Sequence, residues 1–243
     1  MLLATGRIDN VDQTAADFES PFATAVRMRK FDIAECLLAQ GADVNHLSVN
    51  GVLSFPVDGS PVTVLAKVLL EEASLSSLAC VSFLLKTGKA SPYANTALNL
   101  TVLHSLAIRT STAGGSNEDL GRRAFHRLND EFRFSKEILN LRNSHGSTAL
   151  ENAVHNGKAA LVEELLAAGA EWGVVLPNPT GSISPLEAAM KRLFLFPQGV
   201  RVEGDCPPKE KQLDEAFVRQ RHICYMLCRK ARERARESQE PVP

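Results

Sequence analysis

A short phrase recurs along this chain, in which an apolar helix end is followed at once by a glycine. It occupies residues 37–45 and 165–171, and a looser copy occupies residues 84–91. Glycine suits the position after a helix because the chain turns there through a left-handed conformation that a Cβ atom disfavours. A chain made of copies of one helical unit folds as a stacked array rather than around one central core. The recurrence therefore predicts a helical repeat architecture.

A second recurring signal opens a helix at five places. Each begins with a serine or threonine, whose hydroxyl can accept a hydrogen bond from an unpaired N–H group of the first helical turn. Small and apolar residues follow, and in two units a proline stands at the first helical position, which suits its fixed φ. Apolar residues at helical spacing predict a second helix in each of the first four units. The starts lie near residues 20, 63, 101, 148 and 184.

Together, the two signals resemble the pattern of ankyrin repeats. The unit from Gly146 to Ala170 matches best, because it keeps a Thr-Ala-Leu start, an Asn-Gly turn and a Gly-Ala end. The unit from Ser20 to Asn45 is close to the pattern, and the resemblance covers most of residues 1–190. The resemblance implies an all-α, ankyrin-like helical repeat solenoid, which we expect to occupy residues 1–196.

The units depart from the family in their spacing. Their starts are 36 to 47 residues apart, whereas an ankyrin unit has about 33 residues, so every interval holds an insertion. Residues 47–61 extend a finger loop, and residues 71–77 lengthen a turn between helices. Residues 110–133 contain a flexible Gly-Gly break at 113–117, followed by a basic amphipathic piece with Ala124, Phe125, Leu128 and Phe132. The second helix of that unit, expected over residues 134–141, is the least regular element.

The N-terminus resembles the end of a unit rather than a beginning. Residues 2–9 parallel residues 84–91 position by position. Two interpretations stay open: a degenerate capping unit, or the end of a longer array. The first residues lack the charged region of a signal peptide, and no apolar run approaches the roughly 20 residues that a membrane span needs. We expect a cytoplasmic or nuclear monomer without membrane contact.

Nothing in the sequence is typical of an enzyme or a cofactor protein. It has no nucleophile elbow, phosphate-binding loop or zinc-protease motif. The five cysteines form no Cys-x-x-Cys pair, and Cys224 and Cys228 would form a metal pair only if other ligands converged on them. His104 stands at the family's histidine position, for which the resemblance implies a structural hydrogen bond. We expect no catalysis, cofactor, metal or small-molecule substrate.

Candidate partner-binding residues follow from the resemblance, since ankyrin-like arrays bind proteins with finger loops and with the concave face of their first helices. Trp172 is the single tryptophan, and tryptophan is a frequent anchor of interfaces. An alternative is that Trp172 covers a neighbouring finger or helix. His145, in another finger, fits turn contacts equally well. The candidate residues are Trp172, Asp43, Asn45, His46, Phe55 and His145.

A loop and a C-terminal helix with a basic tail are expected over residues 197–243, with the helix from about Gln212 to Glu237. From Arg219 to Glu237 the chain holds seven basic and two acidic residues, although the net charge of the whole chain is −1. This asymmetry leaves nucleic-acid or anionic-surface binding open as an alternative. Against it, the basic residues surround an apolar stripe and lack interleaved aromatic residues. We therefore expect the helix to cap the array with Leu213, Phe217, Cys224, Leu227 and Cys228.

The sequence thus predicts a non-catalytic protein–protein interaction module, in which finger loops and a concave face are presented to a protein partner. One alternative is a targeting or regulatory segment of a larger multidomain ankyrin protein. The other is nucleic-acid or anionic-surface binding through the basic C-terminal helix, against which the near-zero net charge argues.

Overall fold

The computed structural model describes residues 11–12, 19–47, 61–70, 75–95, 97–108, 116–172, 189 and 210–237, and most of them are helical. The chain forms two units, one made of Met1–Thr112 with Arg123–Arg133 and the other of Ala113–Arg122 with Phe134–Pro243. Helix α6 (Ser116–Phe132) contributes residues to both units. The expectation of a mostly helical chain is therefore confirmed.

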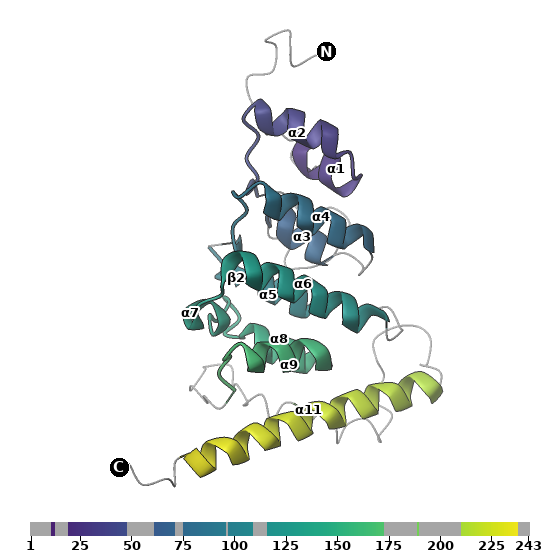
Figure 1. Ribbon diagram of the computed structural model, residues 1–243, viewed down its shortest axis with the longest axis vertical. Helices are drawn as coiled ribbons and strands as arrows, with labels where there is room; N and C mark the ends of the chain where they lie inside the picture. Colours follow the sequence, from purple (N-terminus) through teal and green to yellow (C-terminus); the bar gives the residue numbers. More distant parts are fainter. Residues whose placement is uncertain are drawn as a thin grey trace. The chain divides into compact units, whose positions relative to one another are not determined.

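Helix pairs make up the first unit. Helix α1 (Pro21–Arg27) packs against α2 (Phe31–Ala39), and α3 (Val64–Leu70) packs against both α4 (Leu75–Lys86) and α5 (Val102–Ile108) (Figure 1). The helix starts expected near residues 20, 63 and 101 are confirmed. Helix α4 begins at Leu75, so three of the residues expected to lengthen a turn, 75–77, are helical instead.

Hydroxyl side chains cap the first helices as the sequence predicts. The Ser20 hydroxyl accepts a hydrogen bond of 3.1 Å from the Ala23 N–H, and proline follows at the first helical position. The Thr63 hydroxyl accepts one of 3.4 Å from the Ala66 N–H. Each cap satisfies one of the N–H groups that a helix start leaves without an intrahelical partner.

A small antiparallel sheet interrupts the all-α pattern. Strand β1 (Tyr93–Asn95) pairs with β2 (Leu100–Thr101), and the register shifts between Tyr93 and Asn95. The hairpin closes over an apolar cluster to which α3 and both strands contribute. The buried members of that cluster are Val62, Ala66, Leu70, Ala94 and Leu100.

Two of the first helices lie entirely inside the first unit. Every side chain of α3 is buried, and so is every side chain of α5 from Val102 to Ala107. The buried set includes the polar residues Lys67, His104 and Ser105. These helices therefore form the core of the unit and present almost no surface of their own.

A nearly buried ion pair joins the first helix pair to the second. The Lys67 ammonium lies 2.5 Å from one carboxylate oxygen of Glu19, and the Arg27 Nε lies 3.0 Å from the other. The Lys67 side chain is 6% exposed and the Glu19 side chain 15%. Burial alone would raise the pKa of Glu19, but the hydrogen bonds and charges of Lys67 and Arg27 outweigh burial and hold that pKa below its ordinary value.

The segment after α5 differs from the sequence prediction over more residues than any other described segment. Helix α6 starts at Ser116, inside the segment predicted to be a flexible break. Its Ala124, Phe125 and Leu128 are buried, as the amphipathic pattern predicts. The helix expected over residues 134–141 is instead a single turn, α7 (Lys136–Leu139). The next residue, Asn140, accepts a hydrogen bond of 2.7 Å from the Glu171 N–H through its side chain.

The described residues of the second unit include one complete helix pair and one long helix. Helix α8 (Ala149–His155) packs against α9 (Ala159–Ala167), and α11 (Glu210–Glu237) packs against α9 (Figure 1). Thr148 and Glu151 form a reciprocal capping box at the start of α8. Helix α11 begins two residues before the predicted start. The start expected near residue 184 lies outside the described residues.

The turns that close α1–α2 and α8–α9 are made in the same way. In each turn, three successive N–H groups donate to carbonyls four, three and five residues earlier, which is the Schellman arrangement. The same three bonds recur where α2 and α9 end, so the two helix pairs share these turn bonds at a constant offset of 128 residues. The residue that takes the left-handed conformation is Arg29, Gly41, Gly157 or Gly169, with φ of 57°, 92°, 67° and 96°.

Arg29 and Gly157 are a matched pair for a stability test, because they hold the same place in equivalent turns. A left-handed conformation costs an L-residue about 1–2 kcal/mol, so Gly157→Ala should lower the free energy of unfolding by about 1–2 kcal/mol. A Cβ there would only touch the Gln220 side chain at 3.9 Å. Arg29→Gly should raise stability by up to about 1 kcal/mol. Denaturant titration of the whole chain measures both changes, and equal signs would contradict the equivalence of the turns.

Glu19 gives a pH-dependent prediction. Because folding lowers its pKa, the ion pair contributes fully above the pKa of an unfolded glutamate, about 4.3, and its contribution is lost as the pH falls through the lower folded value. Glu19→Gln should cost roughly 3 kcal/mol at pH 7, since it leaves Lys67 buried without its carboxylate. The variant should then lose less stability than the wild type between pH 5 and pH 3. Glu131→Gln, at an exposed site on α6, is the control.

Candidate protein-interaction surface

The loop after α2 holds three of the predicted binding residues. The Asp43 carboxylate accepts a hydrogen bond of 2.9 Å from the Asn45 N–H, and the Asp43 N–H donates one of 2.8 Å to Asp12. His46 is half-buried, and its N–H donates to the Asp43 carbonyl at 3.2 Å. Asp43 is exposed, so its carboxylate faces solvent while it orders the loop.

Asn45 has a role inside the fold. Its amide nitrogen donates to the Lys89 carbonyl and its amide oxygen accepts from the Ser91 N–H, both at 2.8 Å. One side chain therefore joins the loop after α2 to the loop after α4. A single-sequence pattern shows only that asparagine follows Gly-Ala-Asp-Val, and it cannot show a contact across 44 to 46 residues.

The loops of the second unit place His145 and Trp172. His145 is exposed, and its N–H donates to the Asn143 side chain at 3.0 Å. Trp172 is half-buried and follows Glu171, whose N–H bonds to Asn140. Phe55, the remaining candidate, lies outside the described residues. The structure thus groups Asp43, Asn45 and His46 in one loop of the first unit and leaves His145 and Trp172 in two loops of the second.

The described finger loops share one kind of hydrogen bond. In each, an aspartate or asparagine oxygen accepts a hydrogen bond from a backbone N–H that lies 31 or 46 residues further along the chain. Such bonds fix the loop conformation before any partner arrives, which reduces the ordering cost of binding. The three bonds are Asp12 with Asp43, Asn45 with Ser91, and Asn140 with Glu171.

The second helices of the first unit form a shallow groove. It lies between α2 and α4, beside the stacked rings of Phe31 and Phe83, whose centroids are 4.6 Å apart. Its volume is about 220 Å³, which is smaller than the roughly 300–1,000 Å³ of small-molecule sites. The groove therefore suits a side chain of a bound protein better than a metabolite. Its lining residues are Glu35, Leu38, Phe83, Lys86, Thr87 and Lys89.

The His104 side chain makes hydrogen bonds inside the fold. Its ring is fully buried, and Nδ1 accepts a hydrogen bond of 3.2 Å from the Thr101 N–H and lies 2.8 Å from the Thr101 hydroxyl. Because Nδ1 accepts, the proton of the neutral ring is on Nε2. The ring thus bonds Thr101 at the start of its own helix, α5.

The two cysteines of α11 have different surroundings, because Cys224 is buried and Cys228 is exposed. Burial, and then the neighbouring Cys228, raises the pKa of the Cys224 thiol, which therefore favours the protonated form, a poor metal ligand. Within the described ranges, no group of three or more His, Cys, Asp or Glu side chains is placed to hold a metal ion. No helix in that part of the chain combines the length and apolar character needed to cross a membrane.

Helix α11 has a buried face that the sequence predicted only in part. Cys224 and Leu227 are buried as expected, but Cys228 is exposed, and the predicted stripe is wrong at that position. Gln220 and Ile223 are buried instead. The four buried residues follow the spacing i, i+3, i+4, i+7 of one helix face, and Cys228 lies outside that arc. The side chains of Leu213 and Phe217 are outside the described set.

Gln220 is the polar anchor of this buried face. Its side chain is 1% exposed, and its amide nitrogen donates to the Ala189 carbonyl at 3.1 Å. Its amide oxygen lies close to Gly157, in the turn between α8 and α9. A buried amide must keep its partners, because an unpaired buried polar group is costly. Gln220 therefore favours one register of α11 on its neighbours.

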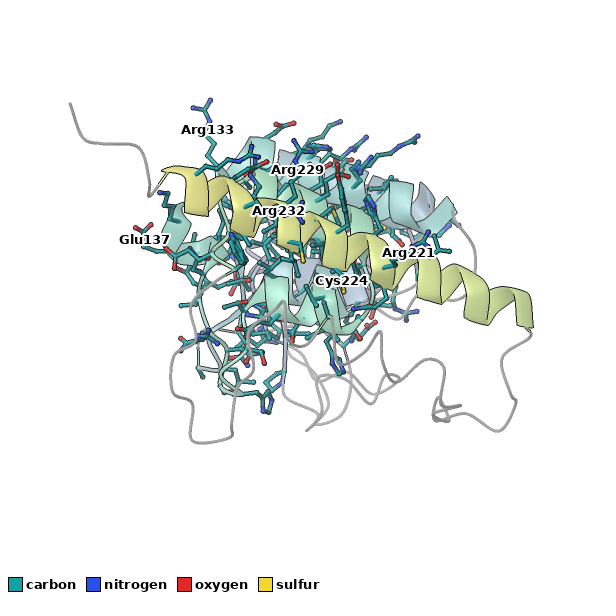
Figure 2. The ribbon with its side chains drawn as sticks, turned by 90° about the horizontal axis from the view of Figure 1, so that it is seen from below. Arg133, Glu137, Arg221, Cys224, Arg229 and Arg232 are labelled. Atoms are coloured by element: carbon teal, nitrogen blue, oxygen red, sulfur yellow. The ribbon has the colours of Figure 1, made fainter. Side chains whose placement is uncertain are left out.

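The opposite face of α11 is exposed and basic. Figure 2 views the helix from the side away from α9, and Arg221, Arg229 and Arg232 lie along it. Tyr225 lies on this same exposed face and is 63% exposed. The expectation that no aromatic residue interleaves with the arginines is therefore wrong. The signal was available in the sequence, since Val218, Tyr225 and Arg232 recur at intervals of seven.

No protein-family model matches the chain, and no curated protein matches it.

Gln220 provides a test of how α11 is held. Gln220→Leu should lower the free energy of unfolding by about 1–3 kcal/mol, because it leaves the Ala189 carbonyl without its donor. Tyr225→Ala, one turn along on the exposed face, should change stability by no more than about 0.5 kcal/mol. Denaturant titration of the whole chain compares them. Similar losses in both variants would show that α11 is not docked through the Gln220 face.

Proposed function

We propose that this chain is a non-catalytic protein-interaction module that acts on another protein in the cytosol or nucleus. In this proposal the chain is an ankyrin-like solenoid of about five helical units, with α11 as its C-terminal cap. The observation that carries the proposal is the bond-for-bond agreement of the turns in α1–α2 and α8–α9. Two copies of one closed helix pair, far apart in the chain, are what a repeat array requires.

The loops support an interaction role. Cross-loop hydrogen bonds from Asp12, Asn45 and Asn140 hold their backbones, so the exposed side chains between them are presented on a fixed frame. Conformations fixed before binding favour affinity, since less entropy is lost in the complex. Asp43 and His145 are exposed on these loops, and Trp172 is half-buried.

The burial pattern narrows the binding surface in the first unit. Helices α3 and α5 are enclosed, so the proposed contact surface there is limited to the finger loops, α1 and the second helices. Met28 and Ile33 are exposed at the end of α1 and on α2, by 58% and 50%. Exposed apolar side chains beside ordered polar loops are common in protein interfaces.

The capping role of α11 is supported by its two faces. A terminal cap covers the apolar surface of the last repeat with one face and presents a polar face to water. The buried residues Gln220, Ile223 and Leu227 and the exposed arginines meet both conditions. The same module would also serve as a targeting or regulatory segment within a larger ankyrin protein.

Affinity capture with matched variants tests the proposal. The whole chain is immobilised and exposed to cytosolic and nuclear extracts, beside Trp172→Ala, Asp43→Ala and the control Arg123→Ala, an exposed residue of α6. We expect at least one protein whose capture falls about tenfold or more in a loop variant, which corresponds to about 1.4 kcal/mol, and is unchanged in the control. Capture that is identical in all four proteins would contradict binding through these loops.

A further inference from the structure

The exposed face of α11 has a consistent chemical character. At 3.6 residues per turn, its exposed side chains fall on one narrow arc opposite the buried face, with Tyr225 near the middle of the arc. Tyr225 and Val218 are 63% and 51% exposed. No acidic residue is among the exposed side chains described on this arc. Its members are Val218, Arg221, His222, Tyr225, Cys228, Arg229, Arg232 and Arg236.

Among the described side chains of α11, the acidic one is Glu233, which lies at the edge of the arc. It accepts contacts of 3.3 Å from Lys230 and 3.0 Å from Arg229. Hydrogen bonds from Lys230 and then from Arg229 hold the pKa of the Glu233 carboxyl below its ordinary value. Glu233 therefore offsets part of the charge at one end of the face, and the arc keeps a positive balance.

Apolar and basic positions alternate along this face in a helical repeat. Val218 and Tyr225 are seven residues apart, and Cys228 follows three residues later. Arg221 and Arg232 continue the same spacing along this line, and Arg229 and Arg236 lie beside it. A line of this kind is the seam along which one helix meets another, with charges beside it that select the partner. Tyrosine and arginine are also enriched among the residues that dominate binding energy in protein interfaces.

We propose that the exposed face of α11, defined by the eight residues of this arc, docks an acidic amphipathic helix of a partner protein. This inference rests on the proposed interaction function and names a partner class for one surface. The apolar side of the partner helix covers Val218, Tyr225 and Cys228. Its carboxylates meet Arg221, Arg232 and Arg236, so charge complementarity selects the partner and sets its orientation.

The seam favours a protein helix over a nucleic acid. Phosphate tracks are held mainly by cations, and they would leave Val218 and Cys228 facing a charged backbone. A membrane fits less well, because an interfacial helix inserts its apolar face, and the apolar face of α11 is buried with Ile223 and Leu227. Docking to a lipid surface through that face would require α11 to leave its site.

A synthetic probe tests this proposal with the whole chain. The probe is a fluorescent peptide of about 21 residues, with leucine at the two seam positions of each heptad and glutamate at most others. A scrambled peptide of the same composition has the same charge and no apolar stripe. A single-stranded oligouridine of about 20 nucleotides and anionic phospholipid vesicles represent the rival partners. Fluorescence anisotropy near 0.15 M salt, and co-sedimentation for vesicles, measure binding.

We expect the amphipathic peptide to bind at least tenfold more tightly than the scrambled peptide. Tyr225→Ala and the double variant Arg221→Glu, Arg232→Glu should each weaken binding about tenfold or more, while Arg123→Glu on α6 leaves it unchanged. All these side chains are exposed, and thermal melting checks that each variant is folded.

Several results would overturn the proposal. Equal binding of the two peptides would show that the surface is a nonspecific anion site. Binding that Tyr225→Ala does not weaken would show that the apolar line does not contact the peptide. Tighter, steeply salt-dependent binding of oligouridine would identify a nucleic-acid surface, and co-sedimentation with vesicles would identify a lipid surface. None of these results changes the expected effect of the loop variants on protein capture from extracts. Failure of the α11 proposal is therefore distinguishable from failure of the proposed function.

Discussion

The shortness of the helices is the constraint on which the structure depends. Helices α1, α3, α5 and α8 have seven residues each, and helices shorter than about 12 residues are marginal in water. Each therefore persists only because its neighbours bury it and because local bonds close its ends. The hydroxyl caps and Schellman turns close the ends, and the Glu19–Lys67 pair fixes one helix pair against the next.

Features decided by local chemistry could be predicted from the sequence. Ser20 and Thr148 mark helix starts because a hydroxyl beside unpaired N–H groups has the same effect in any fold. Gly41 and Gly169 mark helix ends because the left-handed turn excludes most side chains. Arg29 escaped prediction, since a positive φ at an arginine has no local signature. The turn at Arg29 nevertheless has the same three backbone hydrogen bonds as the turn at Gly157, from N–H groups to carbonyls four, three and five residues earlier.

Features decided by distant partners could not be predicted. The bond between Asn140 and Glu171 joins residues 31 apart, and the internal role of Asn45 follows from its bonds to Lys89 and Ser91. The choice of which face of α11 is buried is a similar case. A stripe through Cys228 and one through Ile223 are both reasonable on a helical wheel, and only the neighbouring residues decide between them. The described candidate residues lie in loops, as the sequence predicts, and only the structure shows the contacts that they make.

The identical closure of α1–α2 and α8–α9 has a consequence for how this chain tolerates change. The cap and turn bonds of each pair are internal to residues 20–42 and 148–170, so the same local geometry forms at two distant places along the chain. Surface side chains on either pair are thus free to vary independently, while the hydroxyl start, the turns and the buried leucines stay fixed. A copy of such a pair therefore carries its own caps and turns with it.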